Sequence, residues 1–280
     1  MPERELFDRL RSLAEKYEVS SFCDSDPSQF LRRYSKPEEI EAASFFTALL
    51  SFGSRAAFIP KVKSVFDLAD ESSGFFEWIK SRSFCSSFKS PDGNNSKKFY
   101  RFYSYDEILT FFEELSIVIN KYGSLGKAVY ENAVYENAIR LNEGGAASTS
   151  NTVSAANSSN AVSAANVISS LFPRSKIVPK GKTSANKRIF MFLRWMVRTS
   201  SPVDMGLWTW ISPSSLVIPL DVHVLEESKK LGLIPEKSPC SIKTALQLTD
   251  KLREVWPDDP VKGDFALFGL GVDDDVDDEK

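Results

Sequence analysis

Apolar residues recur every three or four positions along most of the chain, a spacing typical of helices that bury one face. The predicted helices span residues 3–18, 37–51, 57–68, 105–122 and 241–256, with a short one around 30–33 and a last one from 259 to Gly269. Ser35 and Glu38 form a Ser-x-x-Glu pattern, which predicts a capping box at the start of the second helix. We find no stretch with the alternation typical of a strand, so the sequence predicts an all-α fold.

The most informative stretch covers residues 184–233, where a helix with a basic face is followed by an aromatic loop and a second helix. Ser184 is the predicted N-cap of the first helix. One arc of that helix is apolar, and the opposite arc carries the cations Lys187, Arg188, Arg194 and Arg198. These cations have no acidic partner four positions away, so they repel one another. The pattern indicates an anionic partner, either phosphate or an acidic loop of the same protein. A solvated basic face is an equally good interpretation.

The second helix begins after Asp221, which is a good N-cap, and Gly232 is placed to end it as the C′ residue. A carboxylate at a helix N-terminus is stabilised in its charged form by the helix dipole. Asp221 therefore has two interpretations, as a helix cap alone or as an ionised group that also takes part in chemistry.

The run VIPLDVHVLEESKKLGLI, residues 217–234, resembles the Asp-His helix entry of the helix-hairpin-helix (HhH-GPD) DNA glycosylases. Residues 39–68 resemble the first conserved helix of that superfamily. Over most of its length outside 141–170, the chain resembles more closely an uncharacterised bacterial family of conserved hypothetical proteins. The shared blocks are KRxxMFLRWMVR, PLDxHV and DFALFGLGV. In layout the chain is nearest to the archaeal oxoguanine glycosylases, in which the separation between the catalytic lysine and aspartate is also long.

The resemblance implies two helical lobes with a cleft between them, and a catalytic lysine and aspartate. The lysine would attack C1′ of a nucleotide flipped out of the stack, and the aspartate would stabilise the developing positive charge. Asp221 matches the aspartate. Lys187, 34 positions earlier, is the best candidate for the lysine, and the neighbouring cations favour its neutral, nucleophilic form. Arg188, Arg194, Arg198 and His223 become candidate DNA contacts, although His223 is equally placed to hydrogen-bond at the helix start.

The chain departs from the superfamily at the Gly-x-Gly hairpin that binds DNA phosphate. Residues 179–187 supply one glycine, Gly181, where the pattern has two. Lys182 in this loop is a candidate DNA contact and, with Lys180, an alternative nucleophile. Arg194 is a further candidate for the nucleophile's position, and an arginine there cannot attack.

The loop between the two helices carries two tryptophans. Trp208 and Trp210 are placed to sandwich a flipped base, or to fill the core, which the residue types slightly favour. We keep Trp208 as a candidate substrate contact. A second aromatic and basic stretch, residues 97–103, is more simply explained by aromatics that anchor an edge of the core.

Composition excludes several classes of protein. The cysteines Cys23, Cys85 and Cys240 are far apart, which excludes an iron–sulfur cluster and argues against a disulfide framework or zinc ribbon. His223 is the sole histidine, so multi-histidine metal sites are excluded. We expect no metal and no cofactor. No run is apolar enough to span a membrane, and the charged N-terminus does not resemble a secretory signal. We therefore expect a cytoplasmic protein that does not bind membranes, with a monomer favoured.

The acidic residues 273–280 make the net charge of the whole chain negative, although the rest of the chain has a small positive charge. The whole chain has a formal charge of −3, but the last eight residues hold five Asp, one Glu and one Lys, which leaves +2 for the rest. Such a segment is typically a disordered tail.

Residues 141–170 contain VSAAN repeats, which indicates a low-complexity insertion that cannot bury enough surface to order itself. We expect one helical glycosylase-like unit over 1–272.

Three hypotheses follow. The first is a DNA base-excision glycosylase with lyase activity that acts on a damaged purine, and therefore binds damaged duplex DNA. The second is a non-catalytic member of the uncharacterised family that binds nucleic acid or protein. A small-molecule enzyme on the same helical scaffold is a weaker third. A lysine ammonium close to the Asp221 carboxylate in an open cleft would favour the first.

Overall fold

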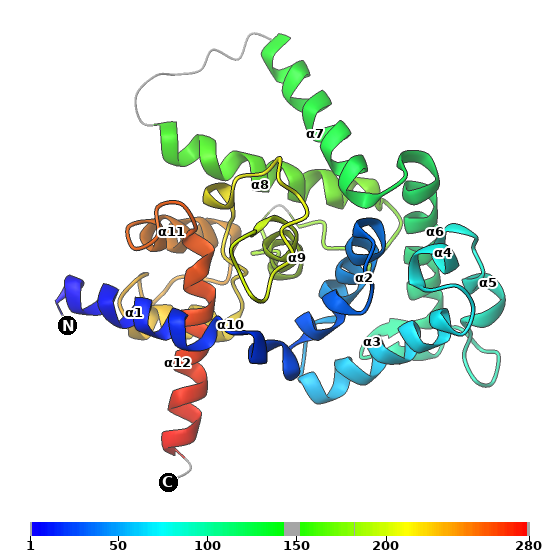
Figure 1. The fold of residues 1–280 in the computed structure, drawn as a ribbon, viewed down its shortest axis with the longest axis horizontal. Coiled ribbons are helices and arrows are strands. Elements are labelled where there is room, and N and C mark those ends of the chain that lie inside the picture. Colours follow the sequence, from blue (N-terminus) through cyan, green and yellow to red (C-terminus); the bar gives the residue numbers. More distant parts are fainter. Residues whose placement is uncertain (1, 143–151, 182, 279–280) are drawn as a thin grey trace. The chain divides into compact units, whose positions relative to one another are not determined.

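The computed structural model describes residues 2–142, 152–181 and 183–278, with side chains described outside 134–160 and 271–278. The chain is mostly helical, so the predicted all-α class is confirmed (Figure 1). It divides into two compact units, which we describe separately. Unit 1 comprises residues 1–24, 148–163 and 181–280, and unit 2 comprises 25–147 and 164–180.

Unit 2 is built around a helix that is buried on every side. Its elements are η2 (Pro27–Arg32), α2 (Pro37–Leu50), α3 (Arg55–Asp70), α4 (Phe75–Lys80), α5 (Phe84–Ser87), β1 (Lys98–Tyr100), β2 (Tyr103–Ser104), α6 (Tyr105–Tyr122) and α7 (Leu125–Asn142). In α2 every residue from Ile40 to Leu50 is buried, as expected for a helix that is apolar all round. The prediction that this helix is central to the core is confirmed.

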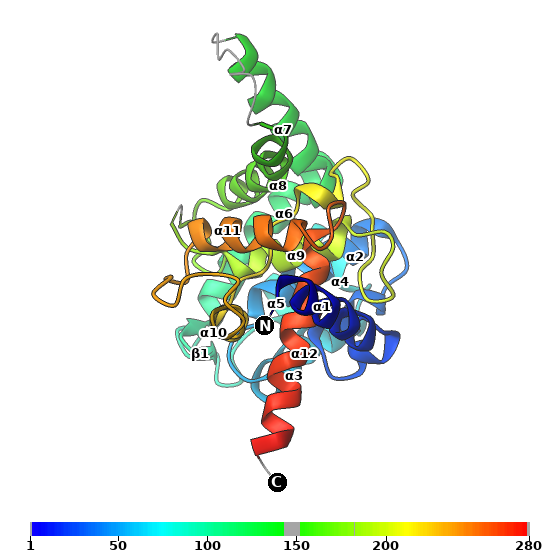
Figure 2. The same ribbon diagram turned by 90° about the vertical axis from the view of Figure 1, so that its left-hand side faces the viewer.

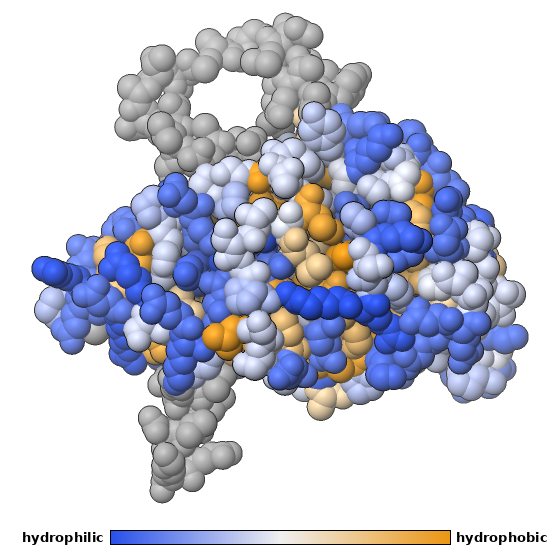
Figure 3. Space-filling view, in the orientation of Figure 1, coloured by the Kyte–Doolittle hydropathy of each residue, from blue (hydrophilic) through white to orange (hydrophobic). Residues whose placement is uncertain are grey.

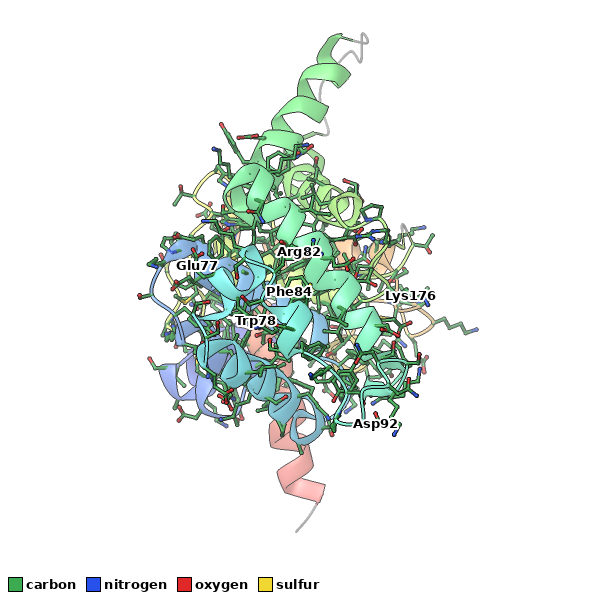
Figure 4. All side chains as sticks on the ribbon, turned by 90° about the vertical axis from the view of Figure 1, so that its right-hand side faces the viewer. Glu77, Trp78, Arg82, Phe84, Asp92 and Lys176 are labelled. Carbon is green, nitrogen blue, oxygen red and sulfur yellow. The ribbon has the colours of Figure 1, made fainter. Side chains whose placement is uncertain are left out.

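Aromatic rings hold the helices of unit 2 together around α2. Phe46 lies 5.8 Å from Phe66 and 5.4 Å from Phe112 between ring centroids, so one side chain joins α2 to α3 and α6. Trp78 and Phe84 lie beside each other in Figure 4, with their ring centroids 5.9 Å apart. Offset and edge-to-face pairs of this kind add to the free energy gained by burying the rings.

The predicted start of α2 differs from the structure. The N-cap of α2 is Lys36 and no capping box forms at Ser35 and Glu38, because Pro37 is suited to the first helical position and places the cap one residue later. A capping box does form at α6, where the Ser104 N–H donates to Glu107 and the Glu107 N–H donates to Ser104.

The short elements α4, α5 and the β1–β2 hairpin were not predicted. The hairpin pairs Lys98 with Ser104 and Tyr100 with Tyr103, a length at which an alternating pattern cannot be recognised. The aromatics Phe99, Tyr100 and Tyr103 are buried, which confirms that this stretch anchors an edge of the core.

The helix α8 (Thr152–Leu171) falls on the predicted insertion. Its described side chains begin at Ala161, and Ala161, Ala164, Val167 and Ile168 are fully buried. The expectation that residues 141–170 cannot order themselves is therefore wrong for residues 161–170. Small apolar residues at helical spacing bury a narrow face of α8. The repeats and the polar composition of the segment made this spacing hard to recognise in the sequence. Residues 143–151 of the insertion lie outside the described residues.

Unit 1 contains the N-terminal and C-terminal helices and the stretch singled out by the sequence. Its elements are α1 (Glu3–Tyr17), η1 (Ser20–Asp24), α9 (Lys187–Val197), η3 (Pro213–Ser215), α10 (Val222–Lys230), α11 (Ile242–Arg253), η4 (Pro260–Lys262) and α12 (Gly263–Asp278). Figures 1 and 2 both show α1 lying against α12. The face drawn in Figure 3 is mostly hydrophilic, with hydrophobic residues in small patches between the polar ones.

The helix α12 does not end at Gly269 as predicted, but continues to Asp278 and so includes part of the acidic segment. Gly269 has a packing role instead. A Cβ atom built there would lie 2.1 Å from Cδ2 of Tyr17, so the absence of a side chain lets α1 and α12 approach closely. Residues 279–280 lie outside the described residues.

Gly269→Ala is expected to lower the free energy of unfolding by about 1–3 kcal/mol, because the added methyl overpacks the α1–α12 contact. Chemical denaturation measures the change. In a Tyr17→Ala background the ring is gone, and the same substitution should cost much less. An equal cost in both backgrounds would contradict the close contact.

Candidate active site at the start of α9 and α10

The start of α9 is fixed by contacts between the preceding loop and the start of α11. Ser184 pairs with Ser241 in an isolated antiparallel bridge, and the Ile242 N–H donates to the Thr183 carbonyl at 3.1 Å. Ser184 is therefore not the N-cap, as was predicted. That position belongs to Asn186, which has left-handed φ and ψ of 49° and 36° and makes no side-chain cap. Lys187 follows as the first residue of the helix.

The start of α10 is fixed by Asp221, as predicted. Its Oδ1 accepts the Val224 N–H at 2.9 Å, the hydrogen bond of an N-cap. The helix ends at Lys230, and Gly232, whose φ is +69°, follows the C-cap Leu231. The Leu233 N–H donates to the Ser228 carbonyl, and the Gly232 N–H donates to the Lys229 carbonyl. This pair of bonds is a Schellman motif, so the predicted C′ role of Gly232 is confirmed.

These two helix starts bring Lys187 and Asp221 together. The Lys187 Nζ lies 3.1 Å from Asp221 Oδ2, and the two side chains are 33% and 30% exposed. Because Oδ1 is occupied by the cap, Oδ2 is the oxygen that faces the ammonium. The pair is thus held by backbone geometry on one side and is reachable by solvent on the other.

Asp221 is ionised in this setting. Burial is the largest single influence and raises the pKa of Asp221, but the charge of Lys187, the Val224 N–H and the charge of His223 together hold that pKa below its ordinary value. An ionised carboxylate next to an amine can stabilise a developing positive charge on a substrate. Lys187 is therefore placed as a candidate nucleophile, next to the carboxylate with which the sequence paired it. Its catalytic role stays a prediction.

Three further side chains belong to the start of α10 or contact the residue before its N-cap. His223 is exposed one residue into α10, and Val222 beside it is 64% exposed. Cys240, a free cysteine, donates from Sγ to the Leu220 carbonyl at 3.8 Å, and burial together with the charge of Asp221 raises the pKa of its thiol. Cys240 was not predicted at this site, because its contact with Leu220 is made by the fold and not by a local motif.

The arginines of α9 have buried partners. Arg194 pairs with Asp204 and Asp264, and Arg198 pairs with Glu18, Asp204 and Asp259. We call these six residues the α9 charge cluster. The side chains of Arg194 and Arg198 are 5% and 2% exposed, so they cannot reach DNA phosphate without unfolding the cluster.

The prediction that Arg194 and Arg198 contact DNA is corrected accordingly. The anionic partner indicated by the basic face is an acidic set within the same unit, one of the two alternatives left open by the sequence. Arg188 remains partly exposed at the helix start.

Phe265 lies within the α9 charge cluster and orders its arginines. The guanidinium carbons of Arg194 and Arg198 lie 4.6 and 5.4 Å from the centroid of its ring. Arg198 binds Asp259 through two nitrogens, with Nε to Oδ1 at 2.9 Å and Nη2 to Oδ2 at 2.7 Å. Burial alone lowers the pKa of Arg198, but Asp204, Asp259 and Glu18 raise it overall, so the guanidinium stays charged.

Trp208 fills the core and does not line an open site. It is 1% exposed, its ring meets Phe192 edge-on at 5.3 Å, and Trp210 stacks on it at 5.6 Å. The backbone N–H of Trp208 donates to the Met196 carbonyl at 2.7 Å, which holds the loop against α9. The prediction of Trp208 as a substrate contact is corrected, and the alternative of a core residue is what the structure shows.

The loop before α9 holds the other predicted residues. Gly181 accepts a hydrogen bond at its carbonyl from the Asn186 side chain at 3.0 Å. The Lys180 ammonium donates to the carbonyls of Phe172 and Ser175, so it is engaged within its own loop. Burial lowers the pKa of Lys180. Lys182 lies outside the described residues.

Sequence reasoning missed the acidic members of the α9 charge cluster as a set. Glu18, Asp259 and Asp264 come from the two ends of the chain, and their pairing depends on α1 and α12 packing together. Within the described ranges, no group of three or more His, Cys, Asp or Glu side chains is arranged to hold a metal ion. Nor is any described helix both long and apolar enough to cross a membrane.

A family model described as "Protein of unknown function (DUF2400)" matches residues 26–273, nearly the whole chain and all of the stretch that holds Lys187 and Asp221. No curated protein and no solved structure matches the chain. The sequence-based assignment to an uncharacterised family is confirmed at this level. The chain therefore belongs to the DUF2400 family, whose description leaves its function open.

Proposed function

We propose that the protein is a DNA base-excision glycosylase with lyase activity, which removes a damaged purine from a flipped nucleotide. The observation that carries the proposal is the 3.1 Å approach of Lys187 Nζ to Asp221 Oδ2 at two adjoining helix starts, with both side chains about one-third exposed. The resemblance of residues 217–234 to the glycosylase helix entry supplies the reaction class. A two-lobed helix-hairpin-helix fold with a cleft is part of this proposal.

In the proposed reaction Lys187 acts as an amine. Its nitrogen lone pair forms a bond to C1′, the bond from C1′ to the base breaks, and the base leaves with that electron pair and takes up a proton given by the lysine nitrogen. The sugar ring then opens as the lysine nitrogen forms a double bond to C1′, and O4′ gains a proton. The product is a protonated Schiff base, which hydride can reduce to a stable amine.

Asp221 would act by charge and not as a nucleophile. C1′ would lie next to the Lys187 nitrogen during attack, so the positive charge that develops on the sugar would lie close to the Asp221 Oδ2 oxygen that faces this nitrogen. The Val224 N–H fixes the carboxylate through Oδ1, which keeps this orientation. His223 and Arg188 are the remaining predicted DNA contacts at these helix starts.

Lys187→Ala is expected to abolish the adduct that borohydride traps between the protein and duplexes that carry oxidised guanine or an abasic site. Gel electrophoresis of the denatured mixture measures the adduct. Lys180→Ala is the matched control and should retain it, since the Lys180 ammonium is bound by carbonyls of its own loop.

The two lysine variants separate the possible outcomes. An adduct lost in Lys180→Ala and kept in Lys187→Ala would move the nucleophile to the loop. A wild-type protein that binds the duplexes without base release or adduct would favour the non-catalytic binding hypothesis, in which Lys187 and Asp221 form only a structural ion pair.

Asp221→Asn separates the charge of this residue from its role as a helix cap, because asparagine caps a helix equally well. Trapping is expected to fall by about 10²- to 10³-fold through loss of charge stabilisation. The folded-state pKa of Asp221 lies below its ordinary value, so its contribution to stability is present at neutral pH and lost as pH falls through that lowered pKa.

Thermal unfolding of both proteins across acidic pH measures this contribution. The wild type should be more stable than Asp221→Asn at neutral pH, and the difference should vanish in acid. A variant with full trapping activity would exclude a catalytic role for the carboxylate.

A further inference from the structure

The α9 charge cluster contains more carboxyl groups than cations. Its four acids are Glu18, Asp204, Asp259 and Asp264, with side chains 5%, 0%, 28% and 14% exposed. Against them stand Arg194 and Arg198, together with Lys262, whose Nζ lies 3.8 Å from Glu18 Oε2. A buried carboxylate without a compensating cation is costly, and such a group takes up a proton instead. The cluster therefore has one acid more than it has cations to compensate it.

The distribution of partners identifies this acid. Asp204 receives both arginines, and Glu18 has Arg198 and Lys262. Asp259 is bound through two nitrogens of Arg198 and is the most exposed of the four. Asp264 has the single partner Arg194, which it shares with Asp204. It is the acid with the least compensation.

Asp264 also interacts electrostatically with the two residues of the candidate active site. It lies in the first turn of α12, and α10, which Asp221 caps, packs against α12. The charges of both Asp221 and Lys187 act on it. The charged groups that act on Asp264 are Arg194 and Lys187 from α9 and Asp221 at the start of α10. The other charged residues of the cluster are Arg198 after α9, Asp204, Asp259 and Glu18, with Lys262 beside Glu18.

We propose that Asp264 is a positioning residue that holds the spare proton of the α9 charge cluster, so that Asp221 is the one ionised carboxylate facing Lys187. The catalytic part of this inference rests on the proposed function. Burial is the largest influence on Asp264 and raises its pKa, and Asp221 raises it further. The charges of Arg194 and Lys187 lower it without reversing the shift, so the pKa of Asp264 lies above its ordinary value.

The proton on Asp264 has a consequence for Lys187. Ionisation of Asp264 would place a second negative charge near the Lys187–Asp221 pair. Two carboxylates favour the lysine ammonium, which has no lone pair and cannot attack C1′. A neutral Asp264 thus favours the nucleophilic form of Lys187, while its side chain still accepts the hydrogen bond from Arg194.

The first test compares the stability of wild type and Asp264→Asn, which resembles the protonated acid in shape. The folded-state pKa of Asp264 lies above the unfolded value, so folding takes up a proton between the two, and the contribution to stability is lost as pH rises through this window. The folding equilibrium constant of wild type relative to the variant should fall about tenfold per pH unit there. Urea unfolding at successive pH values measures it.

Asp8→Asn removes an exposed carboxylate of α1 in the same unit and controls for loss of charge alone. Its stability relative to wild type should show no comparable fall. A ratio for Asp264→Asn that stays level, or that rises with pH, would show that Asp264 is ionised in the folded protein and would overturn the proposal, whether or not the protein is an enzyme.

The second test follows borohydride trapping against pH for wild type and Asp264→Asn. The ratio of variant to wild-type adduct should rise with pH, because Asp264 can ionise and asparagine cannot. A folded variant whose ratio falls with pH would mean that the negative charge is required, and would overturn the proposal. Absence of adduct in wild type would count against the glycosylase function, while the unfolding test still decides the state of Asp264.

Discussion

The pairing of Arg194 and Arg198 with four acids is the interaction on which unit 1 depends. Two guanidinium groups that are almost fully buried would be prohibitively costly without compensating charge, so α9 can pack in the core only where those acids are supplied. The acids come from the end of α1, the loop after α9 and the start of α12. The α9 charge cluster therefore ties these segments to α9, while local contacts fix the two helix starts that carry Lys187 and Asp221.

The cluster also explains why α9 carries so many cations although most of the helix is buried. A helix that carries four cations without local acidic partners resembles a nucleic-acid-binding surface, and the charge pattern alone cannot say which cations are internal. The structure divides them by position along α9. Arg194, two turns into the helix, and Arg198 at its C-cap are buried, whereas Lys187 and Arg188 at its start are partly exposed. Of these four cations, the two at the helix start are the ones that solvent reaches.

Local patterns were predictable where one residue sufficed to decide them. Asp221 and Gly232 were recognised as the two ends of α10, because a cap and a left-handed C′ residue depend on neighbours in the sequence. Ser184 and Gly269 were misjudged, because their roles depend on distant partners, Ser241 and Tyr17. Pairings between residues far apart in the chain, such as Arg194 with Asp264 and Glu18 with Arg198, leave no periodic trace in one sequence.

The site itself combines both kinds of information. The resemblance to the glycosylase motif singled out Lys187 and Asp221, which are 34 positions apart, and the fold brings their Nζ and Oδ2 atoms to 3.1 Å. The partial exposure of the pair supports the proposed chemistry. A purely structural pair gains most when water is excluded, whereas a nucleophile must be reached by its substrate, and these two side chains are open by about one-third.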